Sequence, residues 1–318
     1  MTMADTVKIA TREAYGKTLV ELGAENKDVV VLDADLAEAT KTIYFKKEFP
    51  DRFFDCGIAE QNLISVAAGL AACGKIPFAS SFAMFAAGRA FEQVRNTVAY
   101  PHLNVKICAT HAGVSVGEDG ATHQCLEDIA LMRSIPGMTV INPSDATQAR
   151  AAVIAAAAFD GPVYIRLGRL AVPVIYDKET YRFEIGKADV LSEGTDVTLI
   201  STGMMLTNTL SAANALREKG LSVGVIDMHT IKPIDREALI AAAKKSGAIV
   251  TVEEHSIIGG LGSAVCEVLS EEYPAPVVRV GVRDVFGKSG KGAELIDVFG
   301  LGVSDIIAAA EKAVLLKG

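Results

Sequence analysis

Two stretches of the sequence hold residues whose types and spacing could perform acid–base chemistry on a bound ligand. In the first, Glu60 stands just before a largely apolar run, residues 63–72, that predicts a helix. A carboxylate in the first turn of a helix interacts favourably with the helix dipole, so Glu60 could simply cap this helix. Because the run after Asn62 is apolar, however, this helix end is expected to be buried, and a buried carboxyl group can exchange a proton with a ligand.

The second stretch, residues 111–124, contains two histidines, two carboxylates and three glycines. It follows a predicted strand, and open α/β sheets place their ligand-binding loops after their strands. Glycines let the backbone approach a ligand closely, while His111, Asp119 and His123 supply groups for proton transfer and hydrogen bonding. The histidines lack the short spacing of a zinc site, so acid–base chemistry is the better interpretation.

Between these stretches, Phe82 and Phe85 lie three positions apart near the predicted start of a helix. Aromatic side chains at this spacing are more often part of a hydrophobic core than a platform for a ligand. On the residues alone, both interpretations stay open.

The elements that must position these residues alternate along the chain. In the first half, we predict strands over residues 29–32, 76–79, 105–108, 139–141 and 163–165, and helices over residues 11–22, 60–72, 85–98 and 146–159. Apolar strands without polar alternation are typical of parallel sheets that are covered on both faces. The pattern predicts an α/β fold with a doubly wound first domain.

The alternation lapses over residues 171–190 and then resumes. We predict further strands over residues 197–200, 223–226, 249–252 and 277–280, and helices over residues 206–219, 235–245, 262–272 and 303–316. The sequence therefore predicts two doubly wound domains, one over residues 1–170 and a smaller one over residues 191–318, joined by a linker over residues 171–190.

Composition narrows the classes of function. The chain has 318 residues, of which 50% are hydrophobic, and a net charge of −8, which disfavours nucleic acid as a partner. The five cysteines are scattered and suggest neither disulfides nor zinc. No secretory signal is recognisable, and the longest apolar tract, residues 63–88, is broken by Lys75 and Pro77 and is expected to be a buried helix and strand rather than a membrane span. We predict a soluble, cytoplasmic protein.

Three runs in this order resemble the transketolase family: Ile58-Ala59-Glu60-Gln61-Asn62, Ser81-Phe82-Ala83-Met84-Phe85 and Gly117-Glu118-Asp119-Gly120-Ala121-Thr122-His123-Gln124. Two later segments, Ile231-Lys232-Pro233-Ile234-Asp235 and Val252-Glu253-Glu254-His255 with Gly259-Gly260-Leu261-Gly262, are similar to its C-terminal domain. The resemblance covers nearly the whole chain. It implies a thiamine-diphosphate pyrimidine-binding fold followed by a smaller transketolase C-terminal-like α/β domain, with thiamine diphosphate as cofactor.

The resemblance is to the second half of a full-length transketolase, which implies one subunit of a split enzyme. The Gly-Asp-Gly signal of the diphosphate- and Mg²⁺-binding domain is absent from this sequence. A separate N-terminal-half subunit would then bind the diphosphate and most of the Mg²⁺, and we expect no metal ligand in this chain. The chain would be inactive alone, would form a homodimer alone, and would form a heterotetramer with its partner.

The resemblance also implies roles for the residues around the cofactor. Glu60 would hydrogen-bond N1′ of the aminopyrimidine ring and help to activate the cofactor. Phe85, together with Phe82, would stack on that ring, and His123 would lie near the cofactor's amino group and the substrate's hydroxyls. Asp35 matches an acidic position close to the cofactor. The cofactor would then carry a two-carbon glycolaldehyde unit from a ketose phosphate to an aldose phosphate.

The substrate residues follow from the same resemblance. Asp119 would hydrogen-bond the donor's hydroxyl on the C2 side. His111, Arg12 and Arg169 match positions that bind the substrate phosphate, and Arg166 is a nearby second candidate. Arginine suits this role because its guanidinium group can make paired contacts to a phosphate.

One position departs from the family's pattern. Ala39 stands where the family often has a serine that touches phosphate. The next residue, Thr40, could supply the missing hydroxyl, or the terminal group of the substrate could differ. The type of reaction is therefore implied more strongly than a phosphorylated pentose.

Three alternatives remain. The β subunit of a 2-oxo acid dehydrogenase first component has this length, these domains and an equivalent glutamate, but the run from Gly117 to Gln124 and His111 disfavour it. Deoxyxylulose-phosphate synthase shares the Asp-Gly-x-Thr-His-Gln loop and is normally one long chain. A non-catalytic binding subunit would not need Glu60 and His123.

Overall fold

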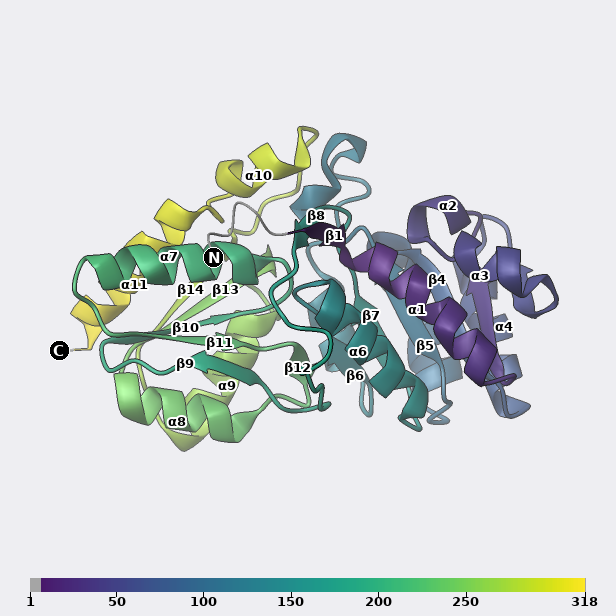
Figure 1. The fold of residues 1–318 in the computed structure, drawn as a ribbon, viewed down its shortest axis with the longest axis horizontal. Helices are drawn as coiled ribbons and strands as arrows, with labels where there is room; N and C mark the ends of the chain where they lie inside the picture. The colour runs from purple at the N-terminus through teal and green to yellow at the C-terminus, as the bar shows by residue number, and fades with distance from the viewer. Residues whose placement is uncertain (1–6, 318) are drawn as a thin grey trace.

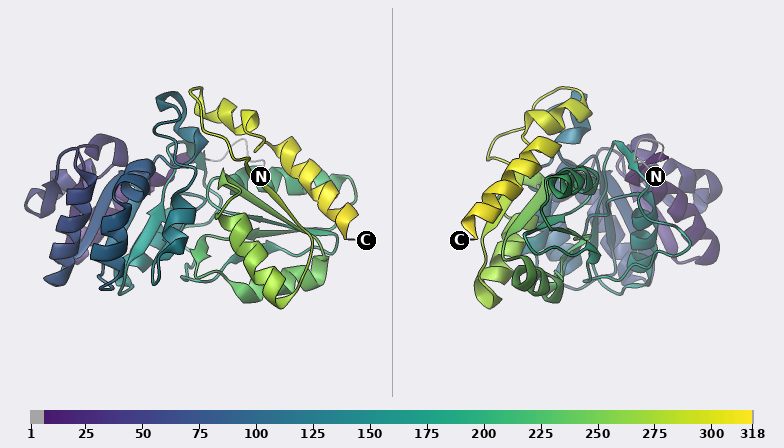
Figure 2. Two further views of the ribbon diagram at one scale, coloured as in Figure 1. Left: turned by 180° about the vertical axis from the view of Figure 1, so that it is seen from behind. Right: turned by 60° about the vertical axis from the view of Figure 1, so that its left-hand side comes forward.

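In the computed structural model, which describes residues 7–317, the chain forms two α/β lobes that lie side by side (Figure 1). Each lobe is built on a mostly parallel sheet. Figure 2 shows from behind and from the side that helices cover both faces of these sheets. The predicted pair of doubly wound α/β domains is confirmed.

The first sheet carries the residues of interest and has seven strands. In spatial order they are β12 (Thr230–Lys232), β6 (Thr139–Ile141), β7 (Val163–Arg166), β5 (Lys106–Thr110), β4 (Ile76–Phe82), β2 (Val29–Asp33) and β3 (Phe53–Asp55). All neighbours are parallel except β12, which is antiparallel to β6. Along β2, Val30 and Leu32 pack into one hydrophobic cluster and Val29 into another, so both faces of the sheet are buried.

The helices of the first lobe are α1 (Thr11–Glu25), α2 (Ala37–Thr40), α3 (Ile43–Glu48), η2 (Pro50–Arg52), α4 (Glu60–Ala72), η3 (Met84–Arg89), η4 (Gln93–Ala99), η5 (Val114–Asp119), α5 (Asp128–Ser134) and α6 (Ala146–Ala158). The single helix predicted over residues 85–98 is wrong in detail, because the structure has two π-helices, η3 and η4, that are separated by residues 90–92. The first wide turn closes when Ala90 N donates to Phe85 O, five residues back, at 3.2 Å. Hydrophobic periodicity does not reveal such a change of helix type.

The second sheet has five strands. In spatial order they are β14 (Val277–Val282), β13 (Ile249–Ser256), β10 (Val197–Ser201), β11 (Val223–Asp227) and β9 (Asp189–Ser192), with only β9 antiparallel to its neighbour. Its helices are α7 (Met205–Glu218), α8 (Arg236–Ser246), α9 (Leu261–Glu272), α10 (Gly292–Val298) and α11 (Val303–Leu316). Leu199 and Ile200 belong to two different hydrophobic clusters, so this sheet is also covered on both faces.

The predicted linker, residues 171–190, is tied to both lobes. Within it, β8 (Ala171–Pro173) pairs antiparallel with β1 (Lys8–Ala10), and the hydroxyl of Tyr176 donates to Asp227 Oδ2 at 2.8 Å. β12, which follows the linker in sequence, joins the first sheet rather than the second. The two halves of the chain therefore interlock. The sequence did not predict β1, β8 and β12, because strands of three residues are too short to show a hydrophobic periodicity. The predicted domain limits at residues 1 and 318 lie outside the described residues.

Two further findings bear on the class of protein. None of the helices within residues 7–317 has the length and apolar character needed to cross a membrane. All five cysteines are free thiols.

Candidate active site

The predicted site residues gather where parallel strands of the first sheet end. Glu60 opens α4 shortly after β3, Phe82 is the last residue of β4, and His111 directly follows β5. Because β3, β2, β4 and β5 are parallel neighbours, their carboxyl ends form one edge of the sheet. Open α/β sheets bind ligands at this edge.

Four of the predicted residues form one cluster of rings at this edge. Phe82 stacks on His111, with centroids 3.9 Å apart and planes inclined by 25°. Phe85 lies nearly parallel to Phe82 at 6.0 Å and meets the His123 ring edge-on at 5.3 Å. The cluster therefore joins a strand, which carries Phe82, a π-helix, which carries Phe85, and the glycine-rich loop, which carries His111 and His123. The structure favours a platform over a purely internal core, because the His123 and Phe85 side chains are only partly buried.

The Glu60 carboxyl group lies beside this cluster and is only 2% exposed. Its Oε2 accepts a hydrogen bond from Arg89 Nη1 at 2.8 Å, and the Arg89 guanidinium carbon lies 4.7 Å from the centre of the Phe85 ring. Within residues 7–317, no donor reaches Glu60 Oε1 and no backbone N–H donates to this side chain. Glu60 therefore does not act as a helix cap, and one of its oxygens is left available to a ligand.

His111 is held as a neutral ring. Burial, then the positive charges of Arg12 and Arg169, lower the pKa of His111 to about 3. Because arginine only donates, His111 Nε2 accepts from Arg12 Nη1 at 3.3 Å, and Nδ1 carries the proton toward Thr110 Oγ1 at 2.8 Å. The backbone of His111 has a φ of +56°, which costs a non-glycine residue about 1–3 kcal/mol and is concentrated at functional sites.

Arg12 and Arg169 form a positive region beside His111. Arg12 Nη1 also donates to Ala39 O at 2.6 Å, but Arg12 Nε is buried without a hydrogen-bond partner in the described part of the chain. Burial and the charge of Arg169 lower the pKa of Arg12. Arg169 Nη1 pairs with Glu118 Oε2 at 2.8 Å. Two neighbouring guanidinium groups with an unpartnered donor are suited to an anion.

The loop that carries Asp119 and His123 is shaped by the second lobe. Gly113 has a φ of +81°, and a Cβ added there would lie 2.3 Å from Glu254 Cδ. Glu254, on β13, accepts a hydrogen bond from Ser115 N at 2.5 Å. Burial raises the pKa of Glu254 to about 7. α10, which belongs to the second lobe like β13, packs against η5 of the first lobe (Figures 1 and 2).

Asp119 and Asp35 lie on loops of this edge, outside the ring cluster. Asp119 ends η5 and is exposed. Asp35 is exposed, has a φ of +61°, and its backbone N donates to Asp55 Oδ1 at 3.1 Å. No hydrogen bond joins either side chain to the cluster among the residues described. Both are free to contact a ligand.

Arg166, the second candidate for binding phosphate, lies in a buried ion pair. Its side chain is 4% exposed, and its Nε pairs with Asp128 Oδ2 at 2.8 Å. Its Nη2 donates to Glu254 O at 2.9 Å. Burial alone would lower the pKa of Arg166, but the Asp128 carboxylate more than offsets burial and raises it. The guanidinium group is thus used inside the protein, and sequence spacing alone could not show that its partner was Asp128.

Thr40 does not supply the hydroxyl that Ala39 lacks. Thr40 is fully buried, and its Oγ1 donates to Asp33 Oδ2 at 2.6 Å. Asp33 also accepts from Thr42 Oγ1 at 2.8 Å, and burial raises the pKa of Asp33 to about 6. These three residues hold the turn that carries Asp35 rather than facing the site.

Sequence reasoning missed Arg89 and Glu254. Arg89 stands four positions after Phe85, a helical spacing that could have placed both on one face. Glu254 belongs to a pair of adjacent glutamates inside a buried strand, which signals a specific partner.

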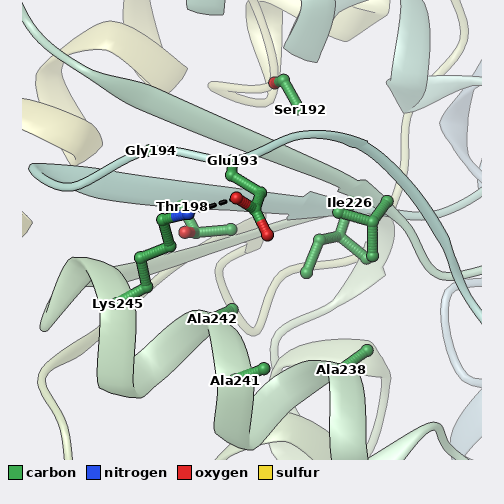
Figure 3. Close-up of a pocket in the computed structure, with 10 residues that line it drawn as sticks. Ser192, Glu193, Gly194, Thr198, Ile226, Ala238, Ala241, Ala242 and Lys245 are labelled. Atoms are coloured by element: carbon green, nitrogen blue, oxygen red, sulfur yellow. Dashed lines mark hydrogen bonds and ion pairs between the residues drawn. The ribbon is translucent and has the colours of Figure 1, made fainter.

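Within residues 7–317, no group of three or more His, Cys, Asp or Glu side chains could hold a metal ion. A cavity of about 80 Å³ lies in the second lobe between β9, β10 and α8, where Lys245 pairs with Glu193 and the remaining lining is largely apolar (Figure 3). It is smaller than the cavities that ordinarily bind small molecules.

Comparison with known proteins identifies the family. Residues 7–174 match the family model of the transketolase pyrimidine-binding domain, and residues 186–306 match that of the transketolase C-terminal domain. The chain belongs to the transketolase family. The resemblance carried by the three short runs is confirmed, and so is the predicted order of the two domains.

Several similar proteins match this chain over nearly their whole length. The chain is 53% identical over 292 residues to a candidate transketolase C-terminal section of Methanocaldococcus jannaschii, covering 91% of this chain and 92% of that one. It is 47% identical over 301 residues to the 6-deoxy-6-sulfo-D-fructose transketolase subunit of a Clostridium species, covering 95% and 93%. A solved structure described as a split-gene transketolase in an inactive β4 tetramer is 59% identical, with a TM-score of 0.91 over 98% of this transketolase-family chain and 100% of the other.

Proposed function

We propose that this chain is the pyrimidine-binding subunit of a split transketolase. It transfers a two-carbon glycolaldehyde unit from a ketose phosphate to an aldose phosphate, with thiamine diphosphate as cofactor and a separate N-terminal-half subunit as partner. The five free thiols support a cytoplasmic location.

The observation that carries this proposal is the Glu60 carboxyl group beside the ring cluster. Glu60 is 2% exposed and has one oxygen without a donor, and Phe85 next to it presents a partly exposed ring. An aminopyrimidine needs these two features, a carboxyl group for a ring nitrogen and an aromatic face for the ring. The residues present therefore fit the cofactor, which when bound supplies the carbon nucleophile that attacks the ketose carbonyl.

The chain's own residues would then act as follows. Glu60 would share a proton between its carboxyl group and a ring nitrogen of the cofactor, and would thereby help to activate the cofactor. Phe85 and Phe82 orient the pyrimidine ring by stacking. His123 lies beside Phe85 and would exchange protons with the substrate's hydroxyl groups. Asp35, exposed on a loop of the same sheet edge, would lie close to the cofactor.

The substrate would lie along the positive region. Arg12, with its unpartnered Nε, and Arg169 would bind the anionic end of the sugar, and the neutral His111 orients Arg12. Asp119, exposed at the end of η5, would accept a hydrogen bond from a donor hydroxyl. The Clostridium relative is named for 6-deoxy-6-sulfo-D-fructose, a ketose that carries a sulfonate instead of a phosphate. The anionic group of the substrate therefore differs among relatives of this chain.

The partner subunit would supply the diphosphate and Mg²⁺ site. Support comes from the similar proteins, which are described as a C-terminal section, a subunit and an inactive tetramer of a split-gene product. We propose a heterotetramer of two chains of each kind, and an inactive homo-oligomer, a homodimer or larger, for the chain alone. Sedimentation of the free chain tests the second point, and a monomer would contradict it.

Reconstitution tests the function. The chain is assayed with thiamine diphosphate, Mg²⁺, xylulose 5-phosphate and ribose 5-phosphate, alone and mixed with the N-terminal-half subunit encoded beside it. We expect turnover only in the mixture, and loss of turnover with intact assembly in Glu60→Ala. Glu92→Ala, an exposed glutamate on the same lobe, is the control and should stay active.

Other outcomes separate the alternatives. Turnover of pyruvate with lipoamide in an assembled mixture would indicate the 2-oxo acid dehydrogenase component instead. Pyruvate consumption with an aldose acceptor would indicate the deoxyxylulose-phosphate reaction. Full activity of Glu60→Ala would show that the proposed cofactor activation is wrong.

A further inference from the structure

Arg89 contacts both of the residues that the cofactor is proposed to contact. Its Nη1 lies 2.8 Å from Glu60 Oε2, and its guanidinium carbon lies 4.7 Å from the centre of the Phe85 ring. The Arg89 side chain is 51% exposed, whereas the Glu60 side chain is 2% exposed. A half-exposed guanidinium group therefore reaches inward to a buried carboxylate.

The π-helix η3 carries both Phe85 and Arg89 and is joined to the start of α4, where Glu60 lies. Phe85 and Arg89 lie on η3, whose wide turn closes between Ala90 N and Phe85 O. The backbone carbonyl of Arg89 also accepts a hydrogen bond from Gln61 Nε2 at 3.3 Å. The end of η3 and the start of α4 are thus joined by two hydrogen bonds of Arg89, one from its side chain to Glu60 and one to its backbone from Gln61. π-helical turns occur frequently at functional sites.

We propose that Arg89 is a positioning residue for Glu60. By holding Oε2, Arg89 leaves Oε1 as the oxygen that faces the cofactor's ring nitrogen, and its contact with Phe85 fixes the stacking ring. Such a device is needed because Glu60 receives no other hydrogen bond within the described residues that would fix its rotation. This inference rests on the proposed function, since it assumes that the aminopyrimidine binds at Glu60.

Stability is not the main effect of this pair. Because Arg89 is half-exposed, water can reach the Glu60 carboxyl group once the guanidinium group is removed, so the loss of stability should be smaller than for a pair that is buried on both sides. Orientation of a reacting group, in contrast, has a large effect on function, because small displacements of a positioned group are costly. Removing Arg89 should therefore lower the melting temperature of the chain only modestly while clearly weakening cofactor binding.

A double-mutant cycle on cofactor affinity tests the proposal. The Kd of thiamine diphosphate is measured by titration calorimetry in the complex with the partner subunit, with Arg89→Ala, Glu60→Ala and the double variant. The diphosphate contacts of the partner keep the affinity measurable in all of them. We expect Arg89→Ala to weaken binding about tenfold, as for a charge-assisted hydrogen bond, and to have no further effect in the Glu60→Ala background.

Two further variants sharpen the result. Arg95→Ala, on the neighbouring η4 and hydrogen-bonded to Asn96, is the matched control and should bind cofactor normally. Arg89→Lys keeps the charge without the planar group and should recover part of the affinity.

The outcomes are distinguishable. If Arg89→Ala binds as tightly as the unaltered chain, or loses the same factor with and without Glu60, Arg89 does not act through Glu60 and the inference is wrong. Tighter binding in Arg89→Ala would show that Arg89 competes with the cofactor, which also overturns it. If Glu60→Ala itself binds cofactor normally, the aminopyrimidine does not contact Glu60 and the premise of this inference is wrong. The proposed function is tested separately, by turnover of the reconstituted pair.

Discussion

Replacing Arg166 with methionine is expected to destabilise the free chain without changing how the assembled enzyme binds its anionic substrate. Arg166 and Asp128 are both buried, with Nε and Oδ2 at 2.8 Å. After the change, Asp128 would keep the hydroxyl of Tyr164 at 2.9 Å and little else. The variant therefore leaves a buried carboxylate without its counter-charge.

The magnitude follows from that loss. Breaking a buried ion pair by removing one partner costs about 3–5 kcal/mol. For a chain of this size each kcal/mol corresponds to about 2–4 °C, so the melting temperature should fall by about 10 °C. Thermal unfolding of the free chain, followed by circular dichroism, measures the shift. The KM for the phosphorylated ketose, measured at 20 °C in the assembled enzyme, should stay within about twofold because the Arg166 guanidinium group is already engaged by Asp128 and the Glu254 carbonyl.

A paired variant separates charge from packing. Arg166→Met together with Asp128→Leu removes both charges, and should recover much of the stability lost in Arg166→Met alone. An unchanged melting temperature in Arg166→Met, combined with a KM raised tenfold or more, would refute this reasoning and return Arg166 to the phosphate site.

Three further predictions concern the loops of the site. Arg12→Ala should raise the KM for a phosphorylated ketose about 10- to 100-fold in steady-state assays, because it removes charged hydrogen bonds, with little effect on an unphosphorylated ketose; equal effects on both would contradict the role. The pKa of His111 is lowered to about 3, so the unfolded chain takes up the proton first and stability falls as pH drops from about 6.5 toward 3; His111→Gln should flatten that fall in urea titrations, and an unchanged slope would be contrary evidence. Gly113→Ala places a Cβ 2.3 Å from Glu254 Cδ at a φ of +81°, so turnover should drop at least tenfold while far-ultraviolet circular dichroism stays unchanged. Normal turnover would show that Gly113 has freedom to move.

Much of the fold could be predicted because it depends on local periodicity. The helix over residues 60–72 and the helix over residues 303–316 occur with those bounds, and each long buried strand is found within a few residues of its predicted limits. What failed has a physical reason. β12 has only three residues and acquires its role by pairing with β6 more than 80 positions earlier, which no local pattern records. The π-helices η3 and η4 differ from an α-helix in hydrogen bonding rather than in composition.

The candidate site was predictable where chemistry lies in consecutive residues. The predicted residues Glu60, Phe82, Phe85 and His123 stand in three short runs of the sequence. These runs lie close together because each lies at or after the carboxyl end of a strand of one parallel sheet. Arg166 shows the limit, because its use depends on which carboxylate lies beside it in space. Burial by distant segments decides whether a charged side chain faces a ligand or a partner within the protein.

The same reasoning gives the second lobe a part in the site without assigning it a catalytic residue. Glu254 holds Ser115 N through its carboxylate, and its carbonyl is in turn held by Arg166 Nη2. Arg166 is fixed by Asp128 within the first lobe. The glycine-rich loop that presents Asp119 is therefore braced by a buried network that crosses between the lobes. Because the hydrogen bond to Ser115 N comes from Glu254 on β13, the first lobe alone would lack this brace even if it folded.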